Sequence, residues 1–564
     1  MGKPQVAPVD GAEANHVTLW VKPRWNGGCS LRVPQAILLG AERPDPTAAL
    51  TGIAGRGIPG ANSVANDPDE ARSAGRGVLL TMGAKAAFIA TGFGTQLLLP
   101  RLIGDEEWGR YSTVGTVTSI VTNTLVAATV QAVSKRTSED EARGESAQRE
   151  GLIAALGLAL LVGGGFGLAS PFLASGWQHD PTMTPLFATA AIVIASYALY
   201  SAQIGAINGR RQFARQSGFD IVFAFLRSGS LLAGAALGAS AGALAGWAGA
   251  AVAIVLGSVL VAGVGAPGRI DLRGWLAFFV PIAIYQAALN GVLQADQPLL
   301  RGHLADMALG AGMAAEEANA LASRIAGQYR AAQTFAFVPY QLILAVTFVV
   351  FPTVSRATAS GDLDATRRAI RGAMRFSLIV VLAMAAPVAG ASDGVMRIAY
   401  PESLLGGSGA LAVLALALVP FSLFAIAASI LAGTGRSIAI AGIASLGLVV
   451  GVIANAIAVR SVGAVPEASI AAAAATGLGA LVALTLAGIA IRSIFGAFLP
   501  WLSALRTVIA AAAGALVAYS VPHATRPGAV LALVLGGLAY LAALAIVREI
   551  GRDDIALFRR VIRR

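Results

Sequence analysis

The sequence predicts an all-α polytopic membrane protein with about 14 transmembrane helices, and three observations support this class. The chain of 564 residues is 56% hydrophobic and only 13% charged, whereas soluble domains carry about 25% charged residues. Its mean hydropathy is +0.71. From residue 78 nearly to the end of the chain, apolar runs of roughly 20 residues follow one another, each long enough to cross a ~30 Å hydrocarbon core as a helix. Because backbone polar groups in lipid must pair internally, these runs indicate helices.

The apolar runs, taken in chain order, give the predicted spans. The fifth and sixth are separated only by the small residues at 240–242, so thirteen spans is the alternative. The predicted spans are 78–99, 111–133, 151–174, 184–207, 217–239, 243–265, 275–299, 329–352, 374–395, 409–432, 436–458, 469–491, 501–521 and 527–547.

The positive charge of the chain predicts its orientation. A net charge of +11 would suit a nucleic-acid partner if it formed one basic patch, but the basic residues are spread over alternate loops. The loops on the side of residue 78 hold most of them, including Lys135, Arg136, Arg210, Arg211 and Arg367. The positive-inside rule then places both termini in the cytoplasm, in a multi-pass protein of the plasma membrane without a nucleic-acid partner.

Catalytic and metal-binding motifs are absent from the sequence. It holds a single cysteine, Cys29, and four scattered histidines, and it has no Walker loop, HExxH or GxSxG motif. A disulfide framework and a thiolate metal cluster are therefore excluded, and we expect neither an enzyme nor a cofactor. The glycine cluster at 163–167 lies inside an apolar span, where close helix packing accounts for it.

Residues 1–74 differ in kind from the rest of the chain. They are polar and rich in Pro and Gly, without hydrophobic periodicity, and their longest apolar stretch, AILLG at 36–40, is too short for a signal-peptide core. We expect a disordered N-terminal tail. A second hypothesis is that this segment lies upstream of the native start.

An internal repeat organises the remainder of the chain. The acidic stretch LPRLIGDEEWGRYSTVGTV at 99–117 contains a Gly-x-Tyr element at 109–111, which recurs at 327–329. VSKRT then matches VSRAT, and the Gly-Arg pair of AINGRR matches that of LAGTGR, so three anchors recur in order at offsets of 218, 221 and 226 residues. An insertion at 302–325, rich in Ala and Glu, lengthens the second copy.

A six-span duplication preserves the orientation of each copy. The predicted architecture is therefore two parallel six-helix repeats related by an axis along the membrane normal, with a substrate path at their interface. The predicted domains are a tail at 1–74, an N-terminal bundle at 75–266, a C-terminal bundle at 267–492, two additional helices at 493–548 and a basic cytoplasmic tail at 549–564.

Two stretches resemble a known family. LPRLIGDEEWGRYSTVGTV and AGQYRAAQTFAFVPYQLILAVTFVVFPTVSRATASGD (326–362) are similar to signatures of the Wzx-like polysaccharide-biosynthesis flippases, which belong to the multidrug/oligosaccharidyl-lipid/polysaccharide exporter superfamily. The resemblance covers about residues 75–560. It implies a V-shaped transporter of two six-helix bundles around a central cavity, which moves a polyprenyl-pyrophosphate-linked oligosaccharide to the outer leaflet. The tail, the insertion at 302–325 and the two extra spans depart from this pattern, and fourteen spans are more typical of the lipid II flippases of the same superfamily.

Two cations within spans are candidate substrate ligands, because an ionisable group at the centre of a span costs ~2.5–3.5 kcal/mol on insertion scales. Lys85 lies in the first span, where it either snorkels to the headgroups or binds a diphosphate; lipid II flippases resemble this in placing cations on their first span. Arg227 lies deep in the fifth span, and its guanidinium fork suits phosphate oxygens. The structural alternative is an ion pair with Asp220 on the same helix face.

Polar residues on the seventh and eighth spans complete the candidate site. Gln286, Asn290 and Gln294 form a stripe that Asp296 extends. Asp296 either pairs with Arg301 or Arg330 as an outer gate, takes up a coupling H⁺ or Na⁺, or is merely an exposed carboxylate at a helix end. On the eighth span, Arg330 and Gln333 give a similar polar lining. For each polar residue the alternative role is hydrogen bonding between helices.

The leading functional hypothesis is a lipid-linked oligosaccharide flippase for cell-surface polysaccharide synthesis that works by alternating access. The alternatives are a lipid II flippase-like protein and a cation-coupled multidrug antiporter, for which deep carboxylates would be expected. A membrane enzyme is disfavoured because the largest outer loop, predicted at 300–328, holds few charges. A transport-inactive scaffold would bind glycan-synthesis enzymes of the membrane. Membrane lipids and the lipid-linked oligosaccharide are the expected partners of a flippase.

Overall fold

The computed structural model describes residues 16–19, 31–34, 68–139, 144–343, 362–433, 436–462 and 465–549. The chain divides into two compact units, residues 1–76 and 77–564. In the first, strands β1 (His16–Leu19) and β2 (Leu31–Pro34) pair antiparallel. Most of the predicted tail lies outside the described residues, so its disorder stays a prediction.

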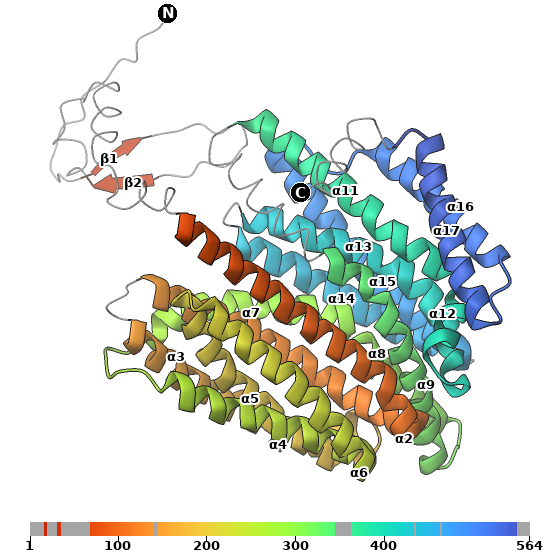
Figure 1. Ribbon diagram of the computed structural model, residues 1–564, viewed down its shortest axis with the longest axis horizontal. Coiled ribbons are helices and arrows are strands. Elements are labelled where there is room, and N and C mark those ends of the chain that lie inside the picture. Colours follow the sequence, from red (N-terminus) through yellow and green to blue (C-terminus); the bar gives the residue numbers. More distant parts are fainter. Residues whose placement is uncertain are drawn as a thin grey trace, which may run out of the picture. The chain divides into compact units, whose positions relative to one another are not determined.

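All of the regular elements that the structure describes in the second unit are helical (Figure 1). In Figure 1 its last two helices lie at the edge opposite to α3–α6. The helices, of which the first begins before residue 77, are α2 (Pro68–Glu139), α3 (Gly144–Leu158), α4 (Gly165–Leu168), α5 (Thr184–Gly209), α6 (Phe213–Ala262), α7 (Leu272–Gln294), α8 (Asp296–Gly310), α9 (Ala315–Ala336), α11 (Leu363–Gly390), α12 (Ser392–Ala399), α13 (Ser408–Ala432), α14 (Ser437–Val462), α15 (Val465–Phe495), α16 (Trp501–Ser520) and α17 (Arg526–Ile546).

Among the described residues, 11 helices are long and apolar enough to cross a membrane, which confirms an all-α, multi-pass membrane protein. Two of them, α2 and α6, each cover two predicted spans, because they break at Gly104 and at 238–239 respectively. In α6 the two limbs fold back on each other, with Gly234 against Gly242. The fifth and sixth spans are therefore separate. The predicted eighth span, 329–352, extends past residue 343 into undescribed residues, so the count of fourteen stays a prediction.

Two stretches that lie between predicted spans are mostly helical. The acidic stretch at 99–117 is helical except at Gly104, whose φ of 78° suits glycine. The predicted outer loop at 300–328 is also mostly helical, since α8 continues to Gly310 and α9 begins at Ala315, and its position outside the membrane stays a prediction. Alanine and glutamate are strong helix formers, and an Ala- and Glu-rich insertion therefore extends the two helices that flank it.

The two halves contact each other reciprocally through the repeated Gly-x-Tyr element. A Cβ atom on Gly109 would lie 1.8 Å from the carbonyl oxygen of Ser323, and a Cβ on Gly327 would lie 2.9 Å from that of Asp105. The offset of 218 residues relates Gly109 to Gly327 and Asp105 to Ser323. Each contact thus maps onto the other, as in an interface around a twofold axis. This packing supports the predicted duplication.

The connection between the halves is held at its two ends. Gly263, just after α6, accepts hydrogen bonds at its carbonyl oxygen from the amides of Gln148 and Gln203. At the other end, Asp271 caps α7 by accepting from the backbone N–H of Gly274 at 3.0 Å, and it pairs with Arg136 at 2.9 Å. The hydrogen bond from Gly274, together with Arg136, holds the pKa of Asp271 below its usual range.

The additional helices α16 and α17 pack on each other and on α11. The hydroxyl of Tyr540 donates to the carbonyl of Ile379 at 2.8 Å, and Gly514 faces Gly536 at close approach. In the first half, Gly163 lies against Ala195 of α5. The expectation that the glycine cluster serves close helix packing is thus confirmed at that position.

Candidate functional site

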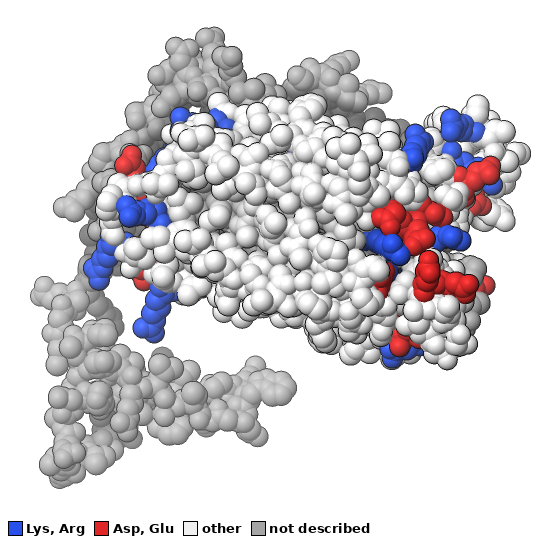
Figure 2. Space-filling model, turned by 90° about the horizontal axis from the view of Figure 1, so that it is seen from below, with Lys and Arg blue, Asp and Glu red and all other residues white. Residues whose placement is uncertain are grey.

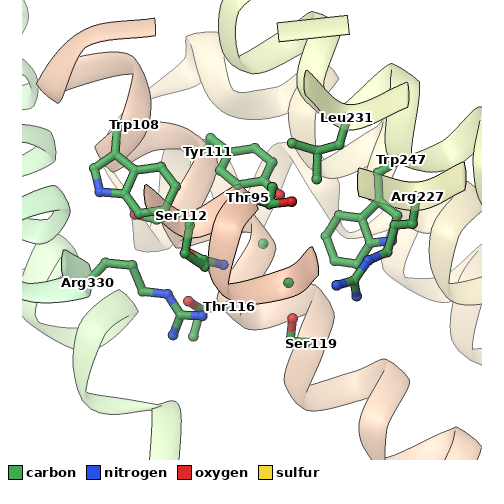
Figure 3. Close-up of a pocket in the computed structure, with 13 residues that line it drawn as sticks. Thr95, Trp108, Tyr111, Ser112, Thr116, Ser119, Arg227, Leu231, Trp247 and Arg330 are labelled. Atoms are coloured by element: carbon green, nitrogen blue, oxygen red, sulfur yellow. The ribbon is translucent and has the colours of Figure 1, made fainter. Parts of the chain in front are cut away.

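A central cavity lies between helices of both halves (Figure 3). It encloses about 460 Å³ of empty space, part of which is open to solvent. Both limbs of α2, both limbs of α6, and α9 line it. The lining residues are Gly92, Thr95, Gln96, Trp108, Tyr111, Ser112, Gly115, Thr116, Ser119, Arg227, Leu231, Trp247 and Arg330.

The cavity is positively charged. Arg227 from the first half and Arg330 from the second lie on opposite sides of it, with serine and threonine hydroxyls between them (Figure 3). The lining residues include no Asp or Glu. Charges interact more strongly in a partly dehydrated cavity than in bulk water, so two guanidinium groups without a lining carboxylate favour an anion. Guanidinium groups bind phosphate oxygens in a bidentate fork.

Among the described residues, Arg227 is positioned by apolar neighbours and forms no ion pair. Its guanidinium carbon lies 4.7 Å from the ring centre of Phe88, and a Cβ on Gly92 would lie 3.4 Å from its Nη2. Within the described part of the chain, no ion pair joins Arg227 to Asp220, so the predicted structural pair is wrong. Asp220 interacts electrostatically with Lys85 instead, and Lys85 is exposed and does not line the cavity.

Arg330 is positioned by a neighbouring amide. Its Nη1 donates to Oε1 of Gln333 at 3.2 Å, and its guanidinium carbon lies 5.8 Å from the ring centre of Phe337. Gln333 is completely buried and does not line the cavity. The structure therefore brings together Arg227, Arg330 and Gln333 from the predicted site.

Aromatic side chains that were not predicted from the sequence form walls of the cavity. The indole N–H of Trp108 donates to the carbonyl of Gly327 at 3.0 Å, and that of Trp247 donates to the hydroxyl of Tyr197 at 3.1 Å. Trp108 also stacks on Tyr111. Only the tryptophan of the GDEEWGRY stretch carried a signal, since it precedes the repeated Gly-x-Tyr element.

Two lining side chains keep hydrogen-bonding capacity. Oγ1 of Thr116 and Oε1 of Gln96 are buried and have no hydrogen-bond partner among the described residues. Hydroxyl and amide groups of this kind can donate to or accept from the hydroxyls of a sugar. The cavity thus combines positive charges that suit an anionic group with polar atoms that suit the neutral hydroxyls of a sugar.

Asp296 lies outside the central cavity, in a polar cluster of the second half. It is 5% exposed, so the interpretation as an exposed carboxylate at a helix end is wrong. Its Oδ1 accepts from Nε2 of Gln333 at 2.7 Å and from its neighbour's backbone N–H at 2.9 Å. Its Oδ2 accepts from the hydroxyls of Tyr329 at 2.5 Å and Thr476 at 2.7 Å. All four donors are uncharged.

A second, small cavity adjoins this carboxylate. Asp296, Thr476 and Asn455 line it together with apolar residues. Asn455 is 1% exposed, and neither its side-chain oxygen nor its nitrogen has a hydrogen-bond partner among the described residues. Carboxylate, hydroxyl and amide oxygens are the ligands that hard cations take in proteins. The donor set fits the predicted uptake of a coupling cation at Asp296.

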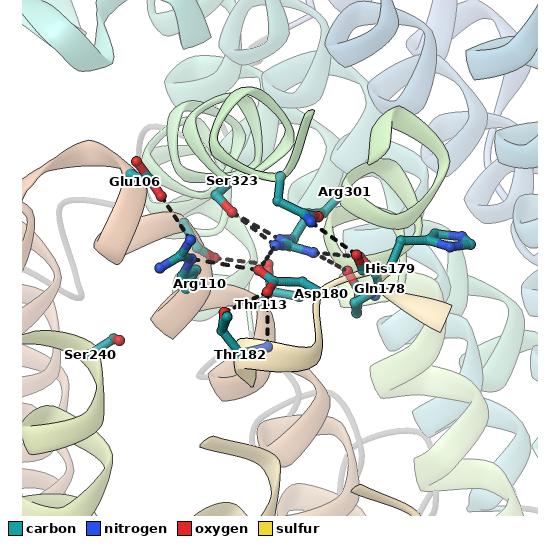
Figure 4. A network of polar contacts seen from close by, with 12 residues as sticks. Glu106, Arg110, Thr113, Gln178, His179, Asp180, Thr182, Ser240, Arg301 and Ser323 are labelled. Carbon is teal, nitrogen blue, oxygen red and sulfur yellow. Dashed lines mark hydrogen bonds and ion pairs between the residues drawn. The ribbon is translucent and has the colours of Figure 1, made fainter. Parts of the chain in front are cut away.

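Arg301 links the two halves through hydrogen bonds and an ion pair (Figure 4). It does not pair with Asp296, contrary to one of the predicted gates. Its side chain is completely buried, and it donates to Oδ2 of Asp180 at 2.8 Å, to the carbonyl of Gln178 at 2.9 Å and to the hydroxyl of Ser323 at 3.0 Å. Asp180 and Gln178 belong to the first half, whereas Arg301 and Ser323 belong to the second, so we call these four residues the seal.

The predicted polar stripe on α7 does not line the central cavity. Asn290 accepts at Oδ1 from Nδ2 of Asn123 at 3.4 Å, and it donates to the carbonyl of Gln286 at 2.8 Å. Gln294 is buried. The structure therefore places Asn290 in hydrogen bonds within and between helices and leaves a substrate role for the stripe as a prediction.

The charged surface separates into two ends. Figure 2 shows a broad band without Lys, Arg, Asp or Glu between two regions where these residues gather. Ion pairs occur among such residues, for example between Arg136 and Asp271 and between Arg324 and Asp105. Such a band is typical of a surface in contact with the hydrocarbon core of a membrane.

These features define a polytopic α-helical membrane protein with two related halves around a central cavity. Solved transporter structures share this fold. The lipid II flippase MurJ in an inward closed conformation superposes with a TM-score of 0.66 at 13% identity, over 83% of this chain and 98% of MurJ. An inward-facing MATE family transporter of the MOP superfamily gives a TM-score of 0.54 at 15% identity, over 73% of this chain and 95% of the transporter.

The outward-facing conformation of a MATE family transporter gives a TM-score of 0.50 at 16% identity, over 76% of this chain and 97% of that one. The chain thus has the fold of the MOP-superfamily transporters. The sequence itself matches no family model and no curated protein.

Proposed function

We propose that this protein is a flippase that carries a polyprenyl-diphosphate-linked oligosaccharide to the outer leaflet for cell-surface polysaccharide synthesis. The observation that carries the proposal is the cavity between Arg227 and Arg330, which has no acidic lining residue. A diphosphate placed between the two guanidinium groups would meet one fork from each half of the chain. The unpartnered polar atoms of Thr116 and Gln96 would serve the sugar.

Alternating access supplies the mechanism. The seal of Arg301, Asp180, Gln178 and Ser323 lies at the end that the positive-inside rule assigns to the outside. In this arrangement the cargo enters from the cytoplasmic leaflet, and opening of the seal releases it outward. A cation, H⁺ or Na⁺, taken up at Asp296 is the proposed driving ion. The protein acts in the plasma membrane and catalyses no covalent step.

Lipid II is the second candidate cargo. The superposition on the lipid II flippase MurJ, which spans 98% of that chain, favours it. Lipid II is itself a polyprenyl diphosphate, so Arg227 and Arg330 would serve it in the same way. A cation-coupled drug antiporter fits less well, because a cationic drug would face two guanidinium groups and no lining carboxylate.

The test determines in which leaflet the lipid-linked oligosaccharide accumulates. The gene is deleted in its host, and a membrane-impermeant glycan-modifying enzyme is applied to inverted vesicles. We expect lipid-linked oligosaccharide to accumulate on the cytoplasmic leaflet and the intact gene to reverse it, while Arg227→Gln and Arg330→Gln restore less than about a tenth of the flux. Lys85→Gln, outside the cavity, is the matched control and should restore transport. An unchanged surface glycan without accumulation would contradict the polysaccharide proposal, and accumulation of lipid II alone would favour the second cargo.

A further inference from the structure

Gln333 contacts both of the charged groups that the proposed function uses. Its Nε2 donates to Oδ1 of Asp296 at 2.7 Å, and its Oε1 accepts from Nη1 of Arg330 at 3.2 Å. The side chain is completely buried. One planar amide therefore spans the gap between the carboxylate cluster of the second half and the cation of the central cavity.

We propose that Gln333 is a positioning residue through which Asp296 sets the orientation of Arg330 in the central cavity. The inference rests on the proposed function, since it assigns Arg330 to the anionic headgroup of the cargo. The two ends of a glutamine amide differ, because the nitrogen only donates and the oxygen accepts. While Asp296 accepts from the nitrogen, the oxygen must face Arg330.

The carboxylate is the fixed end of this connection. Besides Gln333, three donors hold Asp296: the backbone N–H of Gln297, the hydroxyl of Tyr329 and the hydroxyl of Thr476. They come from α8, α9 and α15. A side chain held from three helices cannot turn without breaking several bonds, so it determines which way the amide points.

The guanidinium is the movable end. Among the described residues, Oε1 of Gln333 is the one side-chain acceptor of Arg330, and the ring of Phe337 lies 5.8 Å away. No ion pair holds Arg330 within that part of the chain. A long side chain with a single hydrogen bond keeps many rotamers, so loss of that bond releases the group from its place in the cavity.

The consequence is a coupling between two sites. If the charge at Asp296 is neutralised, the carboxyl group no longer favours the orientation in which the Gln333 amide nitrogen faces it. In the reversed orientation, the NH₂ group of Gln333 would face Arg330. The two sites would then influence each other's affinity by the same factor, as linkage requires. A cation bound at Asp296 would lower the affinity of the cavity for its anionic cargo.

A double-mutant cycle tests this coupling. The full chain is placed in lipid nanodiscs, and its affinity for farnesyl diphosphate is measured for the wild type, Asp296→Asn, Gln333→Met and the double variant. We expect each single change to weaken binding about five-fold, and the double variant to bind no more weakly than either single one. Methionine keeps the length of the side chain and removes both hydrogen bonds. Gln341→Met, at an exposed position, is the matched control and should bind like the wild type.

A second variant keeps the test independent of any loss of folding. Gln333→Glu offers Arg330 an acceptor whatever stands at 296, so adding Asp296→Asn should not weaken binding further. The inference would be overturned if the fold-losses of affinity caused by Asp296→Asn and Gln333→Met multiplied in the double variant. It would also be overturned if Asp296→Asn bound farnesyl diphosphate as tightly as the wild type does. Failure of the proposed function looks different: the wild type and Arg330→Gln would then bind farnesyl diphosphate no better than farnesol, and both proposals would fall.

Discussion

Arg301 is buried where a charged group is costly to desolvate, and it pairs with the carboxylate of Asp180, which is similarly buried. Its side chain is 0% exposed and that of Asp180 is 3% exposed. Arg110 stands 3.6 Å from the same carboxylate. When one member of a buried ion pair is removed, the other is left as an uncompensated charge. The seal is therefore the place where a single substitution should be most costly.

We expect Arg301→Met to lower the free energy of unfolding by about 3–5 kcal/mol, because Asp180 is then buried without its main partner. Adding Asp180→Asn should recover part of the loss. Denaturation midpoints of the purified protein in detergent measure both effects. The matched control is Arg324→Met, whose pair with Asp105 is half-exposed and should contribute less than about 1 kcal/mol. Equal losses for the two arginines would contradict the assignment.

At individual positions, the sequence predicted which charges matter better than it predicted their partners. The depth of Arg227 in its span follows from counting residues. The four hydrogen bonds of Asp296 do not, since the partner Thr476 lies 180 residues away. The same holds for Arg301, whose partner Asp180 lies 121 residues before it. Pairing over such separations depends on helix packing, which composition and periodicity do not encode.

Helices α2 and α9 approach each other more closely than side chains normally permit. At Gly109, a Cβ would lie 1.8 Å from the carbonyl oxygen of Ser323 and 2.4 Å from its carbonyl carbon. These are backbone atoms of a helix interior and cannot turn away as a flexible side chain can. Small residues at helix crossings allow such an approach in membrane proteins.

Gly109→Ala should therefore separate α2 from α9. We expect a loss of about 1–3 kcal/mol in the free energy of unfolding, which is typical of overpacking. Gly94→Ala in the same helix is the control, since a Cβ there meets nothing within 4 Å, and it should leave stability unchanged or raise it. Thermal unfolding of both variants in the same detergent makes the comparison. A Gly109→Ala variant as stable as Gly94→Ala would show that the crossing is looser than the geometry requires.

The elements themselves were largely predictable, and the errors have one cause. Hydropathy located the spans because apolar length is what a membrane selects. It ended the seventh span at 299 and began the eighth at 329, although α8 and α9 continue through most of the interval. An alanine-rich stretch with charges lacks the hydropathy of a span, yet it has the helix propensity to extend one.

For the whole molecule, the orientation in the membrane stays a prediction of the charge distribution. In a Cys29→Ser background, single cysteines are placed at two exposed positions, Arg215 at the start of α6 and Glu316 at the start of α9. A membrane-impermeant maleimide on intact cells should label the cysteine at 316 and leave that at 215 unlabelled until the cells are opened. The reverse pattern would invert the topology and place the seal on the cytoplasmic side.

The sequence by itself determined the membrane class, the repeat and the cations that lie deep in the spans, because apolar length and charge are local properties that need no partner. Only the tertiary structure decided that Arg227 and Arg330 share a cavity while Lys85 and the stripe on α7 lie outside it. It also decided that Asp296 is held by four donors and that Arg301 closes the halves. The physical reason is that a cavity and a seal consist of distances between helices, and these are set by packing at crossings such as Gly109.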